Sequence, residues 1–278
     1  MNLNWLQSIL YGFLSGLTDI LPVSSQAHKV LLLKLFGIQV GMEFIHLWIH
    51  LGIFAALYFC CRSQIVRINR ARALARVPKR RRKRPLDTRT LMDWSMLKTM
   101  LIPVILGLLL YRRTVSLGEN LMLLALFLFL NGLILYIPQF LPGSNRDSRN
   151  LSRVEGLLMG LGGAASMLPG ISAVGCAASI GCVCGVERSY SLNMALLMNL
   201  VLTLGLVVQD VFLLLDAGIG TFSFLILLRY LLTAMTAFGG TVLGVKVMRY
   251  LAGLHGFDLF AFYCFGLSLF TFILNLLA

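Results

Sequence analysis

The stretch Ser15-Gly-Leu-Thr-Asp-Ile-Leu-Pro-Val-Ser-Ser-Gln-Ala-His28 places a carboxylate, several hydroxyls and an imidazole inside a long apolar N-terminal segment. Ionisable groups are costly at bilayer depth, and where they occur they usually mark a binding or catalytic site. Pro22 interrupts the same segment, because a proline removes a helical hydrogen bond. Broken helices at membrane depth usually line a cavity. The stretch therefore predicts a broken membrane helix that carries Asp19 and its polar neighbours to a site.

The composition of the 278-residue chain places these features in a membrane protein. Hydrophobic residues make up 58% of the sequence and charged residues only 13%, whereas soluble domains carry about a quarter charged residues. We therefore predict an all-α polytopic membrane protein in which residues 1–278 form a single integral membrane domain. Apolar runs of spanning length, roughly 20 residues each, predict about six full spanning helices at 43–62, 92–111, 119–138, 190–214, 222–245 and 255–277.

A second break, at Pro169, resembles the break at Pro22. Placing Pro22 over Pro169 also aligns Ser25 with Ser172, and three spanning runs follow each break. An odd number of crossings between two equivalent units inverts the second unit relative to the first, as in many transporters. The sequence thus predicts an inverted-topology repeat with two re-entrant helical hairpins whose tips meet near the midplane. Its two halves are residues 1–138 and 154–278.

Basic residues cluster between two of the spanning runs. Half of the 24 Lys and Arg lie between Arg62 and Arg89, which marks residues 62–91 as a cytoplasmic loop by the positive-inside rule. Such a loop also attracts anionic membrane lipids. The run from Lys79 to Arg84 has no interleaved aromatic residues, so no nucleic-acid partner is expected. With this loop inside, both termini lie outside and the first hairpin opens the site to the outer face.

Two signatures resemble those of a known family. The segment Thr18-Asp-Ile-Leu-Pro-Val-Ser-Ser-Gln-Ala-His28 is similar to the first signature of the undecaprenyl-pyrophosphate phosphatases, the bacitracin-resistance proteins. Leu168-Pro-Gly-Ile-Ser-Ala-Val-Gly175 is similar to the second. Further similarity in His50-Leu-Gly-Ile-Phe-Ala-Ala56 and Gly185-Val-Glu-Arg188 extends the resemblance over nearly the whole chain.

The resemblance implies a hydrolase of the bacterial plasma membrane, an undecaprenyl-diphosphatase that removes one phosphate from a C55 polyprenyl pyrophosphate. That reaction recycles the lipid carrier of peptidoglycan synthesis and is linked to bacitracin resistance. The family uses two carboxylates for a divalent cation, Ser and His as nucleophile or acid and base, and Arg to grip the pyrophosphate. In this chain it implies catalytic roles for Asp19, Ser25 and His28, and substrate contacts from Ser24, Gly170, Ser172 and His50.

Some positions depart from the family pattern. Ser15 and Ala173 stand where the family has Glu and Arg, and Asp19 replaces the second Glu. The chain therefore lacks one carboxylate and the bidentate phosphate-binding group, which neither serine nor alanine replaces. Lys29 follows His28 directly and is the candidate to neutralise phosphate instead, because a point charge binds phosphate without the fork of an arginine.

A polar helix face is a second candidate for compensation. Glu43, His46 and His50 are spaced at i, i+3 and i+7, so they share one face of the first full spanning helix. With Asp19, Glu43 is the candidate to bind the divalent cation, Mg²⁺ or Ca²⁺, through oxygen ligands. The alternative is a hydrogen-bonded seam between helices. Asp210, near the outer end of its helix, is expected at the headgroup level.

Two functions therefore stay open at the level of sequence. The first is a polyprenyl pyrophosphate phosphatase with an altered set of site residues. The second is a catalytically impaired relative that binds or translocates polyprenyl phosphate, since a binding protein tolerates the loss of the family Arg and Glu better than an efficient hydrolase does. Both functions have a polyprenyl phosphate lipid as the partner.

Overall fold

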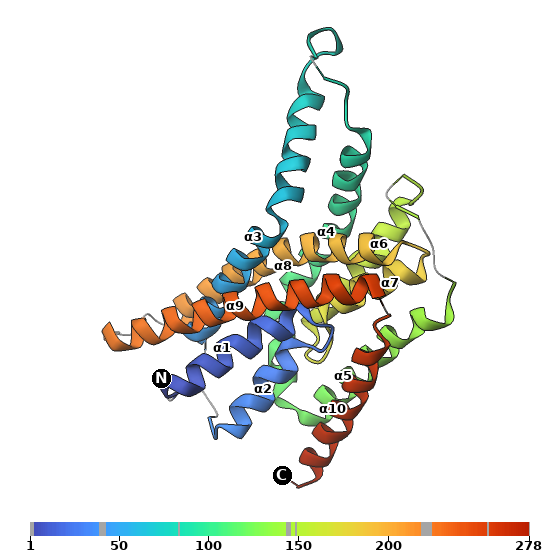
Figure 1. Cartoon of the computed structure of the whole chain (residues 1–278). Coiled ribbons are helices and arrows are strands. Elements are labelled where there is room, and N and C mark those ends of the chain that lie inside the picture. The colour runs from blue at the N-terminus through green and yellow to red at the C-terminus, as the bar shows by residue number, and fades with distance from the viewer. Residues whose placement is uncertain are drawn as a thin grey trace.

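The computed structural model describes residues 3–38, 43–82, 84–142, 146–147, 149–217, 224–254 and 256–277. Their regular structure is helical (Figure 1). Six of the described helices are long and apolar enough to cross a membrane, which confirms the all-α polytopic membrane fold. The α-helices are α1 (Trp5–Ile20), α2 (Ser25–Leu35), α3 (Glu43–Arg76), α4 (Thr88–Thr114), α5 (Leu121–Tyr136), α6 (Arg153–Ala164), α7 (Ala173–Val183), α8 (Arg188–Ala217), α9 (Phe224–Leu254) and α10 (Asp258–Leu277).

Both predicted breaks are present. Helix α1 ends before Pro22, and Ser24 starts α2 by accepting a hydrogen bond at its Oγ from the Ala27 amide at 3.4 Å. The short 3-10 turn η4 (Ala165–Met167) follows α6, and Ser172 starts α7 by accepting from the Gly175 amide at 3.2 Å. Serine is a favoured N-cap because its oxygen satisfies an amide that has no helical partner. Each break therefore restarts a short helix.

The two halves of the chain pack through close backbone contacts between small residues. Helix α1 packs along α9, and a Cβ added at Gly16 would lie 2.1 Å from the Ala237 carbonyl oxygen. Helix α6 packs along α4, where a Cβ at Gly160 would lie 2.2 Å from the Met100 carbonyl oxygen. Small residues let membrane helices approach closely. In each case the first helix of one half contacts the second spanning helix of the other, although the inverted orientation of the halves stays a prediction.

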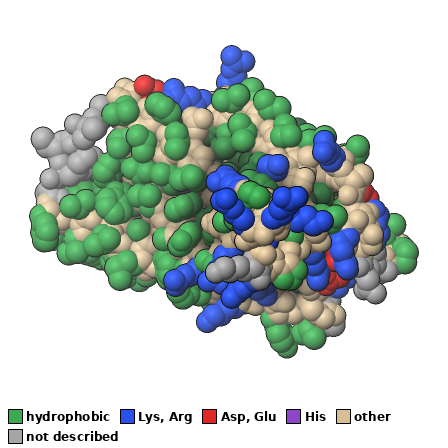
Figure 2. Space-filling model, turned by 90° about the horizontal axis from the view of Figure 1, so that it is seen from above, with side chains coloured by type: hydrophobic (Ala, Val, Ile, Leu, Met, Phe, Trp, Pro, Cys, Tyr) green, Lys and Arg blue, Asp and Glu red, His purple; other side chains and the backbone are tan. Residues whose placement is uncertain are grey.

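The basic segment between α3 and α4 differs from the sequence prediction. The prediction of a loop over residues 62–91 is wrong for most of that range, because α3 continues to Arg76 and α4 begins at Thr88. Between the two helices lies a 3-10 turn, η1 (Lys79–Arg81). A helix of this length is about 51 Å long, well beyond the roughly 30 Å of a hydrocarbon core. The α3–α4 hairpin stands out from the rest of the chain in Figure 1, and Figure 2 shows Lys and Arg side chains gathered at this end.

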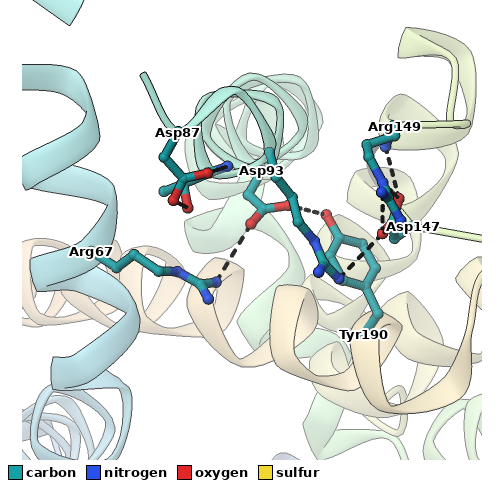
Figure 3. A network of polar contacts seen from close by, with 8 residues as sticks. Arg67, Asp87, Asp93, Asp147, Arg149 and Tyr190 are labelled. Carbon is teal, nitrogen blue, oxygen red and sulfur yellow. Dashed lines mark hydrogen bonds and ion pairs between the residues drawn. The ribbon is translucent and has the colours of Figure 1, made fainter. Parts of the chain in front are cut away.

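Ion pairs fix the base of this hairpin (Figure 3). The buried Asp93 of α4 accepts a hydrogen bond from the Tyr190 hydroxyl of α8 at 2.9 Å and lies 3.5 Å from Arg67 of α3. Asp147 accepts hydrogen bonds from the Arg149 guanidinium, which hold the pKa of the Asp147 carboxyl below its usual range. Arg89 of α4 also lies 3.2 Å from Asp147. The Tyr190–Asp93 and Arg89–Asp147 contacts therefore tie the projecting hairpin to the helical body.

Candidate active site

A cavity of about 140 Å³ lies between the two breaks. Helices α2 and α7 both begin at its wall, so the positive ends of two helix dipoles lie near it. Its lining combines polar or titratable side chains with apolar ones, as in many ligand sites. The polar residues that line it are Asp19, Ser25, Gln26, Lys29, His46, His50, Tyr111, Ser166, Ser172 and Asn199.

Asp19 supplies a carboxylate to this cavity from the last turn of α1. Its Oδ2 accepts a hydrogen bond from Asn199 Nδ2 of α8 at 2.9 Å. Asn199 is buried, so its amide holds the carboxylate in a fixed orientation without neutralising it. The sequence reasoning missed Asn199, because an amide in the middle of a long apolar helix has no spacing signal that connects it to Asp19.

A chain of three buried titratable side chains lies beside the cavity. Lys29 Nζ of α2 is 3.2 Å from His50 Nε2 of α3, and His50 Nδ1 is 2.5 Å from Asp210 Oδ2 of α8. The three residues are only 7%, 4% and 2% exposed, so they are withdrawn from solvent together. Asp210 was expected at the headgroup level. It instead turns inward, because α3 and α8 pack along each other and bring it to His50.

His46 lies one helical turn before His50 and also lines the cavity. Its Nε2 is 2.8 Å from the Tyr11 hydroxyl, and the two imidazole rings are 6.5 Å apart. The Glu43 side chain lies outside the described residues. Among the side chains that the structure does describe, no group of three His, Cys, Asp or Glu is placed to hold a metal ion. The described donors alone therefore do not complete a cation site, and the predicted Asp19–Glu43 site stays a prediction.

The hydroxyls of the two breaks have different surroundings. Ser25 lines the cavity and donates from its Oγ to the Ser15 carbonyl oxygen at 3.1 Å. Ser172 also lines it, and its Oγ lies 3.4 Å from the Leu21 carbonyl oxygen, which joins the two breaks directly. Ala173 lines the cavity at the position of the family Arg. The structure thus brings together one serine from each signature, although they lie far apart in the chain.

Three other residues of the signatures face elsewhere. His28 Nε2 is 2.8 Å from the Tyr263 hydroxyl of α10, and its Nδ1 is 2.8 Å from the Ser24 carbonyl oxygen. Ser24 is buried and serves as the cap of α2, with a φ of 65°. Gly170 has a φ of 113° and lies so close to α5 that an added Cβ would be 2.7 Å from the Phe127 side chain. None of the three belongs to the described lining of the cavity.

The fold and the cavity together define a polytopic membrane protein with a buried polar site built from two broken helices. The sequence matches the family described as Bacitracin resistance protein BacA over residues 8–270, so the chain belongs to that family. An undecaprenyl-diphosphatase of Methanobrevibacter smithii is 28% identical over 273 residues, which cover 96% of each chain. One from a Nocardioides species is 30% identical over 203 residues, or 73% of each chain. The family resemblance of the two signatures is confirmed.

Proposed function

We propose that this protein is an undecaprenyl-diphosphatase, which hydrolyses a C55 polyprenyl pyrophosphate to the monophosphate. One observation supports this proposal above all. The cavity joins Asp19 and Ser25 of the first signature to Ser172 of the second, beside the buried Lys29. Phosphoryl transfer needs positive charge and hydrogen-bond donors around the phosphate oxygens and a positioned nucleophile. The relatives that match nearly the whole chain carry the name of this activity.

The chain offers a group for each of these tasks. Ser25 attacks the terminal phosphorus to form a phosphoserine, which a water then hydrolyses to inorganic phosphate and free Ser25, or Ser25 orients a water that attacks directly and yields inorganic phosphate in one step. In both routes the bond from that phosphorus to the bridging oxygen breaks. The bridging oxygen leaves with the lipid monophosphate. Asp19 lines the same cavity and is the group that accepts the proton of the nucleophile. Free amides in the first turn of α7, which begins at Ala173, donate to phosphate oxygens as helix N-termini commonly do.

The proposed site opens to the outer face of the bacterial plasma membrane. The basic α3–α4 hairpin marks the cytoplasmic end of α3 by the positive-inside rule. His50 lies near the other end of α3, roughly 18 Å along the helix axis from Arg62. Asp210 likewise lies in the C-terminal part of α8. The polyprenyl chain would remain in the bilayer while its pyrophosphate enters the cavity.

The divalent cation, Mg²⁺ or Ca²⁺, remains part of the proposal. Asp19 and Glu43 are the residues that would hold it, and it would supply charge neutralisation to the pyrophosphate. Asn199 already occupies one oxygen of Asp19, and His50 has both ring nitrogens engaged.

A second candidate function is binding or translocation of polyprenyl phosphate without hydrolysis. Ala173 favours it, because the cavity has no arginine at the position where the family has one. Ser15 favours it too, because the hydroxyl that replaces the family Glu is buried and has no hydrogen-bond partner. Loss of the family Arg and Glu should impair stabilisation of the transition state of hydrolysis more than it impairs binding of the lipid.

One experiment separates the two functions. Purified protein in detergent is incubated with C55 pyrophosphate, with and without Mg²⁺ or Ca²⁺, and both inorganic phosphate and the lipid product are measured. The phosphatase proposal predicts equal amounts of phosphate and polyprenyl monophosphate, with turnover well above one per protein molecule. Saturable lipid binding without release of phosphate, under all cation conditions, would overturn the phosphatase proposal in favour of the second function.

A further inference from the structure

The cavity that lacks the family arginine is lined by a buried lysine, Lys29. Ala173 and Lys29 both line it, from α7 and α2 respectively. An ammonium group has three N–H donors, and His50 engages one of them. Burying such a charge is unfavourable unless it is paired. The geometry therefore raises the question of what stabilises Lys29 there and what its remaining donors bind.

We propose that Lys29 is the pyrophosphate-binding cation of this chain and that Asp210 is a positioning residue that holds it through His50. This inference rests on the proposed function, since it names the group that binds the substrate of that reaction. The ligand class is a pyrophosphate or phosphate monoester carried by an isoprenoid lipid. The assignment differs from the family pattern, in which an arginine of the second signature has this task.

The direction of the hydrogen bonds supports the relay. An ionised Asp210 carboxylate can only accept a hydrogen bond, so we assign the donated proton to His50 Nδ1. The neutral imidazole then presents an unprotonated Nε2, which accepts a hydrogen bond from the Lys29 ammonium. One N–H of Lys29 is fixed in this way, and two are left for the oxygens of a ligand in the cavity.

The placement of Asp210 suits this role. Asp210 does not belong to the described lining of the cavity, whereas His50 and Lys29 do. Its negative charge therefore lies behind the imidazole, where it adds to that of Asp19 in offsetting the cost of burying Lys29, without itself facing the phosphate. A carboxylate in direct contact with Lys29 would instead compete with the ligand for the same donors.

The test is binding of a short-chain probe, farnesyl pyrophosphate, to the full-length protein in detergent, with farnesol as the uncharged comparison. Lys29→Met should weaken farnesyl pyrophosphate binding about tenfold to a hundredfold, as expected for lost charge-assisted hydrogen bonds, and leave farnesol binding unchanged. Lys34→Met is the matched control, because Lys34 is an exposed lysine of the same helix. Lys29→Arg should keep most of the binding, and Lys29→Gln, which removes the charge but stays polar, replaces Lys29→Met if that variant fails to fold.

The relay itself is tested by a double-mutant cycle. Asp210→Asn should weaken farnesyl pyrophosphate binding in the wild-type background and have little further effect in the Lys29→Met background. Asp216→Asn is the control in α8, since Asp216 is exposed and pairs with Arg112 at 2.9 Å. Additive effects of Lys29→Met and Asp210→Asn, or equal loss of farnesol and farnesyl pyrophosphate binding, would mean that the three residues are only a structural seam.

The outcome does not depend on turnover. Phosphate release is measured in parallel, so the two proposals can fail separately. Tight pyrophosphate binding that needs Lys29, without phosphate release, would support the inference while the phosphatase proposal fails. Phosphate release with unchanged farnesyl pyrophosphate binding in Lys29→Met would support the phosphatase and overturn the inference.

Discussion

Two adjacent glycines of α9 give a sharp test of how helix packing positions the site. A Cβ added at Gly240 would lie 2.2 Å from the Phe13 carbonyl oxygen of α1, whereas one added at Gly239 would meet no atom within 4 Å. A carbon and a carbonyl oxygen approach to about 3.3 Å at closest. Gly240→Ala therefore forces α1 and α9 apart by roughly 1 Å, and overpacking of this kind costs about 1–3 kcal/mol.

The same displacement reaches the catalytic groups, because α1 carries Asp19 in its last turn. A misplacement of about 1 Å at a catalytic centre costs on the order of a hundredfold in rate. Gly240→Ala should therefore lower the thermal unfolding midpoint in detergent and reduce phosphate release by about that factor. Gly239→Ala is the control and should leave both measurements near wild type. Equal unfolding midpoints and equal rates for the two variants would refute the packing argument.

Three further predictions concern the hairpin and the helix ends. The pKa of the Asp147 carboxyl is lowered in the folded state, so its contribution to stability is present at neutral pH and is lost as the pH falls through the folded pKa. On acidification, the thermal unfolding midpoint of the wild type should therefore fall more than that of Asp147→Asn. Parallel curves of unfolding midpoint against pH would contradict this. Tyr190→Phe removes a hydrogen bond to the buried Asp93 and should cost about 1–3 kcal/mol in chemical unfolding, whereas an unchanged midpoint would mean that the contact adds nothing. Asn120 caps α5 by accepting hydrogen bonds from the Met122 and Leu123 amides. Asn120→Ala should therefore lower the free energy of unfolding by about 0.5–2 kcal/mol in the same assay, whereas Asn120→Asp, which keeps the acceptor, should leave it near the wild-type value.

The spanning helices and the two breaks could be predicted from the sequence because both depend on local composition. Hydropathy identifies residues that can face lipid, and Pro22 and Pro169 each stand at a helix break among nearby glycines and serines, whereas Pro103 stands inside α4 without ending it. The length of α3 could not be predicted in the same way. Hydropathy falls from Arg62 onwards, but arginine and alanine are good helix formers, and the helix continues to Arg76.

The candidate site could be predicted only in part. Asp19, Ser25 and Ser172 line one cavity as the signatures suggest, whereas His28 contacts Tyr263 instead. Asp210 was undervalued because its role depends on the packing of α8 against α3, which no spacing within one helix reveals.

Hydrolysis is proposed to take place in the cavity between the two breaks. The most direct measurement is the rate of phosphate release from C55 pyrophosphate by Asp19→Asn, compared with Asp216→Asn. Asp19 lines the cavity and Asp216 lies exposed near the end of α8. Asp19→Asn should lose at least about a hundredfold in rate, as expected when a catalytic acid or base is removed, and Asp216→Asn should release phosphate at a rate near wild type. Full activity of Asp19→Asn, in protein that folds normally, would contradict this proposal.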